Sequence, residues 1–314
     1  VMEMNHFPFE FKEFDPEQSQ EIINNFKGTY TVGPQGFVMP DRYKEVASII
    51  YNLSVQPSDI FIISFPRSGT TWTQELVWLL ANDLDYQMAA MVPLIARYYK
   101  MLKEHENEKT KELLKMMTAN PRETFAAMRG RRFVKSHLPL SLLPPALLDT
   151  AKVVCVVRDP RDCAVSFYHF NRLYKGVQFY HFVSVIYTPF FKMYKEAWGK
   201  RDHPNILFMF YEDMIKDLRG AVLRVSAFLG KQLSEAQTQR LCDHLVFDNF
   251  KNNKSVNLVA VDDNFTNAGE EGFIREGKAG GWRKYFDDEM RAQAEHWIAQ
   301  NLAGTDLRFP EHEQ

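Results

Sequence analysis

The sequence predicts an α/β fold in which a central, mostly parallel β-sheet is flanked by helices. Short runs rich in β-branched and aromatic residues alternate with longer segments of helical periodicity. Two of these runs, IFIISF at 60–65 and KVVCVV at 152–157, are almost wholly apolar, as expected for central strands that helices cover on both faces. Further strands are predicted at 133–136 (FVKS) and 206–211 (ILFMFY).

Helices are predicted directly after three of these strands, at 70–80, 160–174 and 214–229. In the last helix apolar residues recur at steps of three and four, the pattern of a helix that packs on a sheet. These residues are Ile215, Leu218, Val222, Val225 and Leu229. Gly230 follows them and is expected to end the helix.

Composition describes a globular chain without a general attraction for polyanions. Of the 314 residues 45% are apolar, and 38 basic against 40 acidic residues give a net charge of −2. We therefore expect neither a nucleic-acid nor a membrane-surface partner, so that any anion must be bound by local clusters. Three cysteines provide no disulfide framework, which favours a reducing compartment.

Targeting signals and breaks between domains are not recognised. The first thirty residues lack the basic start and apolar run of a secretory signal, and the apolar run VVCVV at 153–157 is far shorter than the roughly 20 residues that span a bilayer. Without a repeat or a Gly/Ser-rich linker, residues 1–314 are predicted to form one domain. The charged stretch at 103–115 is interpreted as a solvated helix face or a mobile insertion.

The segment SFPRSGTTW at 64–72 predicts a phosphate-binding turn between a buried strand and a helix. Such a turn directs backbone N–H groups and the positive end of the helix dipole at one point. Gly69 permits close approach of the backbone, Thr70 and Thr71 add hydroxyl donors, and Arg67 adds a fixed charge. The alternative is an ordinary strand–helix turn capped by Ser68.

This turn differs from the loop that binds nucleoside triphosphates. That loop reads G-x-x-x-x-G-K-[ST], with a lysine after the last glycine. Here Thr70 follows Gly69, and the basic residue Arg67 precedes the glycine. A kinase-like site for a triphosphate and magnesium is therefore not predicted.

A second strand–helix junction, VVRDPRDCAVSFYHF at 156–170, predicts another anion site. Asp159 is a suitable N-cap and Pro160 a suitable first helical residue. Arg158 then stands at the end of the strand, and Ser166 lies about two turns along the helix on the face of Asp159. A basic side chain and a hydroxyl can thus converge on a second phosphate. The alternative is a surface turn held by an Asp159–Arg161 ion pair.

Five segments together resemble the cytosolic sulfotransferases, which use 3′-phosphoadenosine 5′-phosphosulfate (PAPS) as donor. PRSGTTW is similar to the family's 5′-phosphosulfate loop, VRDPRDCAVSFYHF to its 3′-phosphate segment, and FVKSHLPL to the segment with its catalytic histidine. FYEDM is similar to a nucleotide-binding strand end, and IREGKAGGW to a C-terminal R-K-G-x-x-G-x-W loop. The order and spacing match from about Pro40 to Arg283.

The resemblance implies a binding site for PAPS and for its product, 3′-phosphoadenosine 5′-phosphate (PAP). The 5′-phosphosulfate would be held by Arg67, Ser68, Gly69, Thr70 and Thr71. The adenine would lie against Trp72, Tyr211 and Phe247. The 3′-phosphate would be bound by Arg158, Ser166, Arg275 and Gly277.

The resemblance also implies a cytoplasmic enzyme that moves a sulfuryl group from PAPS to the hydroxyl of a small hydrophobic alcohol or phenol. His137 would be the general base, since an unperturbed imidazole is substantially neutral at cytosolic pH. Lys135 and Arg67 would stabilise the charge of the transferring group. No metal is expected, because the nine histidines form no recognisable metal motif.

Two regions are expected to shape the acceptor site. Residues 1–39 are predicted to be an N-terminal extension that packs near it, and residues 82–131 a variable region that contributes to its pocket. The cluster MAAMVPLIARYY at 88–99 is either part of that hydrophobic pocket or an ordinary core helix.

Three departures from the family pattern carry expectations of their own. Arg67 stands where lysine is usual, so it can stabilise charge but not donate a proton to the leaving group. Glu276 replaces the usual lysine of R-K-G, which predicts weaker dependence on that loop or a side chain turned to solvent. The family's dimer motif K-x-x-x-T-V-x-x-x-E is not recognised in RKYFDDEMRAQAEHW from Arg283, so a monomer or an atypical dimer is expected.

Three other functions stay open at the level of sequence. Some insect relatives that this chain resembles remove water from an allylic alcohol such as retinol. Their product is the dehydrated molecule instead of the sulfated alcohol. A nucleotide kinase would need the lysine that the loop lacks. A non-catalytic protein that binds PAP or PAPS is compatible with Arg67 and Glu276.

Overall fold

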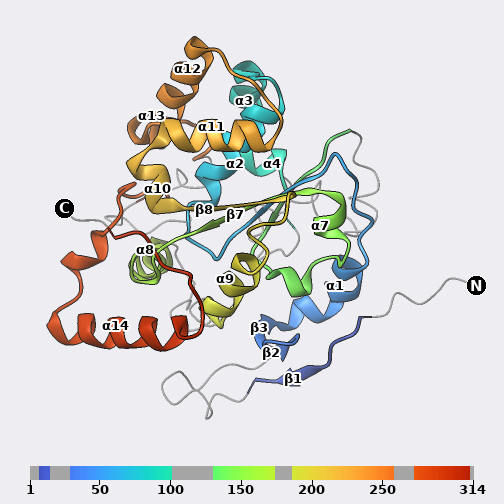
Figure 1. The fold of residues 1–314 in the computed structure, drawn as a ribbon, viewed down its shortest axis with the longest axis vertical. Helices are drawn as coiled ribbons and strands as arrows, with labels where there is room; N and C mark the ends of the chain where they lie inside the picture. The colour runs from blue at the N-terminus through green and yellow to red at the C-terminus, as the bar shows by residue number, and fades with distance from the viewer. Residues whose placement is uncertain (1–6, 15–28, 101–129, 174–185, 258–271, 312–314) are drawn as a thin grey trace, which may run out of the picture. The chain divides into compact units, whose positions relative to one another are not determined.

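The computed structural model describes residues 7–14, 29–100, 130–173, 186–257 and 272–311 of the chain (Figure 1). The chain groups into two compact units, each described by itself below. Unit 1 consists of Val1–Ile63, Tyr98–Val154 and His181–Ile206. Unit 2 consists of Ser64–Arg97, Cys155–Tyr180 and Leu207–Gln314.

A five-stranded sheet confirms the predicted α/β class. Its strands are β4 (Ile60–Ile63), β5 (Tyr99–Lys100), β6 (Phe133–Ser136), β7 (Lys152–Val157) and β8 (Ile206–Phe210), in the spatial order β5-β6-β4-β7-β8. β6 pairs in parallel with both β5 and β4. Since parallel strands need crossover connections, helices are expected between them, and the described residues between β4 and β5 include three, at 70–81, 86–91 and 94–97.

The predicted strands are confirmed, with small differences at two ends. β6 and β7 have the predicted bounds, β4 ends two residues early at Ile63, and β8 ends one residue early at Phe210. At both shortened ends the next residue, Ser64 or Tyr211, begins a loop or a helix that carries predicted site residues. All of β4 is buried, as expected for a central strand.

Unit 1 also contains a small antiparallel sheet that the sequence reading did not predict. It consists of β1 (Phe11–Glu13), β2 (Thr29–Val32) and β3 (Phe37–Pro40), in that spatial order (Figure 1). The edge of β3 exchanges backbone hydrogen bonds with another segment, Val38 N donating to Thr188 O and Tyr187 N to Val38 O, both at 2.8 Å. The helical elements of this unit are α1 (Asp41–Tyr51), η2 (Leu140–Leu142), α7 (Leu147–Thr150) and α9 (Phe190–Trp198).

Unit 2 is built around α2, the helix that follows β4. Two later helices, α11 (Leu218–Phe228) and α12 (Glu235–Leu245), pack on α2 (Thr70–Ala81) (Figure 1). Two short helices extend this group, α10 (Tyr211–Lys216) against α11 and α13 (Phe247–Asn252) against α12. The remaining elements are α3 (Tyr86–Met91), α4 (Leu94–Arg97), α8 (Pro160–Leu173), η4 (Gly281–Lys284) and α14 (Asp288–Leu302). The predicted helices at 70–80 and 160–174 are thus confirmed as α2 and α8.

The single helix predicted over 214–229 is wrong, because the chain breaks at Asp217. This residue leaves the helical region at φ −141°, and its carboxylate accepts a hydrogen bond from Gly220 N at 2.8 Å to begin α11. An aspartate favours such a cap over a helix interior. Val222 and Val225 are buried as predicted, and Gly230 ends the helix with φ +68°.

The apolar cluster at 88–99 is not one core helix. It spans two short helices, α3 and α4, and the start of β5. Three of its side chains are exposed: Met88 at 44%, Met91 at 70% and Ile95 at 37%. The core-helix alternative is therefore wrong, and a role in an acceptor pocket stays a prediction. The charged stretch at 103–115 lies outside the described residues.

The described segments contain neither a membrane-spanning helix nor a cluster of metal ligands. Among them no helix is both long enough and apolar enough to cross a bilayer. No group of three or more His, Cys, Asp or Glu side chains there is arranged to hold a metal ion. Cys155 and Cys163 are buried and Cys242 is half-buried, and all three are free thiols.

A buried ion pair joins the beginnings of β4 and β6. Arg132 Nε donates to Asp59 Oδ1 at 2.7 Å and Arg132 Nη2 to Asp59 Oδ2 at 2.5 Å. Their side chains are only 3% and 0% exposed. Arg132 Nη2 also donates to Ser54 O at 2.8 Å, and Ile60 N to Arg132 O at 2.9 Å. The pair therefore fixes where the two strands start side by side.

We expect Asp59→Ala to lower the free energy of unfolding by about 3–5 kcal/mol, because it leaves the Arg132 guanidinium buried without its counter-charge. Urea denaturation measures the change. Glu235→Ala, which removes the exposed Arg219–Glu235 pair, is the control and should leave the midpoint unchanged. Equal midpoints for both variants would contradict the role of the Asp59–Arg132 pair.

Candidate functional site

The loop from β4 to α2 has the geometry of an anion-binding turn. Two residues adopt left-handed backbone conformations, Arg67 with φ 69° and Gly69 with φ 91°. A Cβ on Gly69 would lie 2.5 Å from Tyr211 Cδ2, so the close approach requires glycine. An arginine in the left-handed region is strained, a feature concentrated at functional sites.

The amino end of α2 has no side-chain cap, because its N-cap residue is Gly69. Ser68 is fully buried, and its hydroxyl lies 3.3 Å from Cys163 Sγ. The alternative of a turn capped by Ser68 is therefore wrong. The first N–H groups of an α-helix have no partner within the helix, so an uncapped end offers them to an anion.

The two threonines that begin α2 differ in environment. The hydroxyl of Thr70 lies 2.5 Å from Ser64 Oγ, and both residues are buried. Thr71 is half-buried. Thr71 is thus better exposed to a ligand, whereas Thr70 also fixes the turn internally.

Arg67 joins three segments of unit 2 that are distant in sequence. Its Nε donates to Ser166 Oγ at 3.1 Å, and its Nη2 donates to Phe273 O at 2.9 Å. The guanidinium carbon lies 4.9 Å from the ring centre of Phe170 and 4.7 Å from that of Phe273. The contacts to these two rings and to Ser166 bring the predicted phosphate residues together.

Arg158 makes a second connection and retains an unused donor. Nη1 donates to Arg67 O at 3.1 Å, and Nη2 donates to Lys278 O at 3.0 Å. Its guanidinium lies 4.3 Å from the ring centre of Tyr211. Nε of this buried side chain is inaccessible to solvent and has no hydrogen-bond partner. A buried unpaired donor is costly, and a bound anion would satisfy it.

The aromatic residues predicted to face adenine form two contacts. The Trp72 and Tyr211 rings meet edge to face with centres 5.9 Å apart, and Trp72 Nε1 donates to Leu245 O at 2.9 Å. Gly277, with φ 62°, packs so closely on the Phe247 ring that a Cβ there would collide with it. Phe247, which only loosely matches the family pattern, is thereby brought to the C-terminal loop.

Asp162 holds the C-terminal loop on α8. This role of Asp162 was not predicted from the sequence. Its buried carboxylate accepts hydrogen bonds from Gly280 N at 2.7 Å and from Trp282 N at 3.0 Å. The only sequence signal is an acid in the first turn of α8, which also suits the helix dipole.

Asp159 is the predicted N-cap of α8, and it also forms the ion pair with Arg161 that the sequence left as an alternative to a phosphate site. Its Oδ1 caps α8 by accepting from Arg161 N at 2.8 Å, and its carboxylate pairs with the Arg161 guanidinium at 2.6 Å. Asp159 N donates in turn to Glu212 Oε1 at 2.8 Å. Burial raises the pKa of Glu212 from 4.5 to about 7, and the hydrogen bond from Asp159 N acts against this shift.

Arg275 and Glu276, next to Gly277, form an ion pair of 3.1 Å. The Glu276 side chain is 24% exposed, so the expectation that it turns to solvent is wrong. Arg275 Nη1 also donates to Tyr285 Oη at 3.2 Å. The C-terminal loop thus carries a carboxylate that pairs with its own Arg275.

The two predicted residues nearest the chemistry, Lys135 and His137, belong to unit 1. Lys135 lies in β6, and His137 follows this strand directly. His137 is buried at 8% exposure, and its ring centre lies 5.7 Å from that of Tyr187. In the sheet, Ser136 stands opposite Ile63, the residue immediately before the loop that starts at Ser64.

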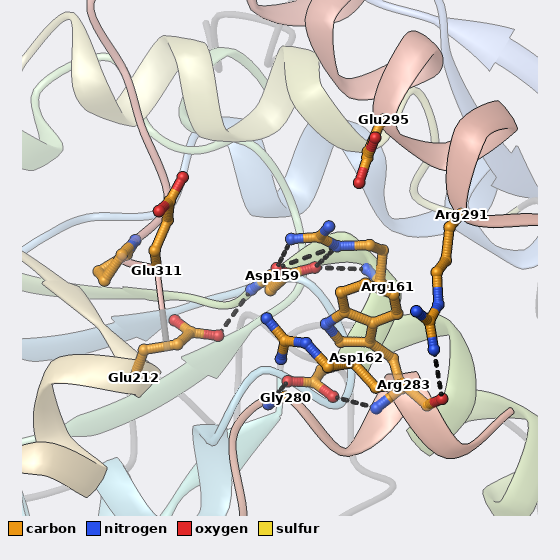
Figure 2. A pocket seen from close by; sticks show the side chains of 11 residues that line it. Asp159, Arg161, Asp162, Glu212, Gly280, Arg283, Arg291, Glu295 and Glu311 are labelled. Carbon is orange, nitrogen blue, oxygen red and sulfur yellow. Dashed lines mark hydrogen bonds and ion pairs between the residues drawn. The ribbon is translucent and has the colours of Figure 1, made fainter. Parts of the chain in front are cut away.

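Unit 2 contains a cavity of about 550 Å³ (Figure 2). It is lined by Asp159, Arg161, Asp162, Glu212, Gly280, Trp282, Arg283, Arg291, Glu295, Pro310 and Glu311. None of the residues predicted to bind the donor belongs to this lining. The unpartnered donor of Arg158 and the uncapped end of α2 lie outside this lining, and they are the features that suit an anion.

Comparison with known proteins identifies the family. The model of the sulfotransferase domain matches residues 57–306. The chain belongs to the sulfotransferase family. This sulfotransferase-family enzyme is 30% identical over 308 residues to luciferin sulfotransferase of Photinus pyralis, covering 91% of this chain and 83% of the relative. It is also 30% identical to sulfotransferase 1E1 of Homo sapiens, covering 87% and 94% of the two chains.

A solved structure is more similar still to this sulfotransferase-family chain. Retinol dehydratase in complex with retinol and PAP is 42% identical, with a TM-score of 0.84 and coverage of 97% of this chain and 99% of that one. The same values hold for retinol dehydratase in complex with androsterone and inactive cofactor PAP.

Glu212 generates a prediction about pH. Its pKa in the folded protein, about 7, exceeds its ordinary value of 4.5, so the folded state binds more protons than the unfolded state between these pH values. Glu212 therefore costs stability as pH rises through this window. Because one pKa unit corresponds to 1.36 kcal/mol, Glu212→Gln should gain up to about 3 kcal/mol relative to wild type between pH 4 and 8.

Urea denaturation of both proteins across this range measures the gain. Glu289→Gln, a change of the same charge on the exposed face of α14, is the control and should show no such pH-dependent difference. Parallel pH profiles for wild type and Glu212→Gln would contradict the raised pKa.

Proposed function

We propose that this protein transfers a sulfuryl group from PAPS to the hydroxyl of a small hydrophobic alcohol or phenol. The observation that carries the proposal is the buried, unpartnered Nε of Arg158 beside an uncapped helix end. Such a combination suits a nucleotide with more than one phosphate group. Solved relatives in complex with PAP support the same ligand.

The described residues fit this donor in three respects. The left-handed Gly69 and Gly277 leave room where a Cβ would strike Tyr211 or Phe247. Arg67 and Ser166 are already in contact, so cation and hydroxyl are positioned together. When bound, PAPS supplies an activated sulfuryl group whose leaving group is a phosphate.

The protein's own groups have distinct tasks in the proposed reaction. Bonds from Arg158 to Arg67 O and Lys278 O position the loop before a ligand arrives, which lowers the entropic cost of binding. His137 takes the proton of the acceptor hydroxyl as its oxygen attacks sulfur. Lys135 and Arg67 stabilise the negative charge of the transferring group.

We expect His137→Ala to lower kcat by about 10²–10⁴-fold, the usual contribution of a positioned base. Transfer of radiolabelled sulfate from PAPS to a panel of alcohols and phenols measures turnover, and calorimetry measures PAP affinity, which should not change. His296→Ala, in the exposed part of α14, is the control. Unchanged turnover in His137→Ala would refute the base, and wild-type protein that binds PAP but consumes no PAPS would favour the non-catalytic binder.

A second product is favoured by the 42% identity to retinol dehydratase. After transfer, the C–O bond of a sulfated allylic alcohol can break, with sulfate leaving with the electron pair and a neighbouring carbon losing a proton. The balance is then alkene, sulfate and PAP from alcohol and PAPS. Mass spectrometry of the products of retinol and a simple phenol separates the two reactions, since only dehydration releases free sulfate in step with PAP.

The proposed acceptor is a hydrophobic molecule with a hydroxyl group, as retinol and androsterone are in the complexes of the relative. We propose that residues 1–39 and 82–131 contribute to its site, that the chain acts as one domain in the cytoplasm, and that it does not use the family's dimer motif. Deletion of residues 1–6 with acceptor KM as the readout tests the first of these points.

Gly277→Ala should weaken PAP binding by tenfold or more, because the new methyl displaces Phe247 and strains a backbone with φ 62°. Isothermal titration calorimetry measures the affinity. Gly304→Ala has a similar φ of 77° but open space around the new Cβ, so it controls for backbone strain alone. Equal PAP affinities of the two variants would argue against placing this loop at the nucleotide.

A further inference from the structure

The C-terminal loop carries a carboxylate on the same arginine that is proposed to bind phosphate. Glu276 Oε1 lies 3.1 Å from Arg275 Nη1 and 3.9 Å from Lys284 Nζ. The Arg275 side chain is only 9% exposed, so this pairing is poorly screened by water. Arg275, which is proposed to bind phosphate, is thus already paired with a carboxylate of its own loop.

The other oxygen of this carboxylate is held inside the loop. Glu276 Oε2 is inaccessible to solvent and has no hydrogen-bond partner. It lies 3.3 Å from the position that a Cβ on Gly281 would take. A carboxylate kept in this position pays a desolvation cost that an exposed side chain would avoid.

The C-terminal loop is held in place on several sides, so the Glu276 carboxylate cannot easily move away from Arg275. Arg158 holds it through Lys278 O, and Asp162 holds it through the N–H groups of Gly280 and Trp282. Gly277, the neighbour of Glu276, rests against the Phe247 ring. Negative charge is therefore fixed one residue from two of the proposed phosphate ligands, Arg275 and Gly277.

We infer that Glu276 is a specificity-determining residue that weakens the hold on the 3′-phosphate and thereby speeds release of the spent nucleotide. The inference rests on the proposed function. A carboxylate on Arg275 competes with phosphate for the guanidinium, and repels a doubly charged phosphate bound beside it. Both effects act only on nucleotides that carry the 3′-phosphate. Since product release limits many enzymes, weaker binding of PAP favours turnover.

The test compares PAP with adenosine 5′-phosphate, which lacks the 3′-phosphate. We expect Glu276→Gln to bind PAP about tenfold more tightly by calorimetry and to release it about tenfold more slowly in stopped-flow displacement, with the affinity for adenosine 5′-phosphate unchanged. Glu276→Lys should show a larger gain for PAP alone. The gain should shrink at high salt, as a charge effect does.

Glu295→Gln, which makes the same charge change on exposed α14, is the matched control and should not alter either affinity. Unchanged PAP affinity in Glu276→Gln, or equal gains for both nucleotides, would overturn the inference. If the proposed function were wrong, the result would be a different one: the wild-type protein itself would bind no PAP in the same calorimetric experiment. Circular dichroism of both Glu276 variants establishes that they are folded like wild type.

Discussion

The arginine that follows β7 is the constraint on which the proposed donor site depends. Arg158 donates from two nitrogens to main-chain carbonyls, Arg67 O and Lys278 O, and so ties the β4–α2 turn to a loop that lies 120 residues after Arg158 itself. Its third nitrogen stays buried and unpaired. Hydrogen bonds from a charged group contribute about 1.5–3 kcal/mol each. One buried side chain thus both joins the two loops and keeps a donor for the proposed ligand.

Acidic side chains are the counterpart of this cationic centre. Asp162 fixes the C-terminal loop, Asp159 begins α8, and Glu212 accepts from the backbone N–H of Asp159. These carboxylates are buried or nearly so and act on backbone N–H groups. Glu276 differs from them because it faces a cation of the proposed site. The near-neutral net charge of −2 thus includes locally opposed charges, and we propose that donor affinity depends on their balance.

Local sequence patterns predict where the strand–turn–helix junctions form but not how firmly the loops are held. The strand–turn–helix junctions at Gly69 and Asp159 follow from glycine tolerance and capping, which act over a few residues. For this reason β6, β7, α2 and α8 could be predicted closely. The break at Asp217 could not, because apolar periodicity continues through it while the carboxylate caps a new helix. Nor could the sheet β1–β3, because the pairing of β1 with β2 joins segments more than ten residues apart in sequence.

The sequence by itself determined the α/β class, the family and the residues proposed to hold the donor, since these depend on order, spacing and residue type. Only the tertiary structure decided which contacts hold these residues and their loops in place. Arg67 packs between Phe170 and Phe273, Asp162 clamps a loop over a hundred residues away, and Glu276 pairs with Arg275 instead of facing solvent. Such contacts join distant segments, and their energies depend on burial and distance, which no local pattern of residues specifies.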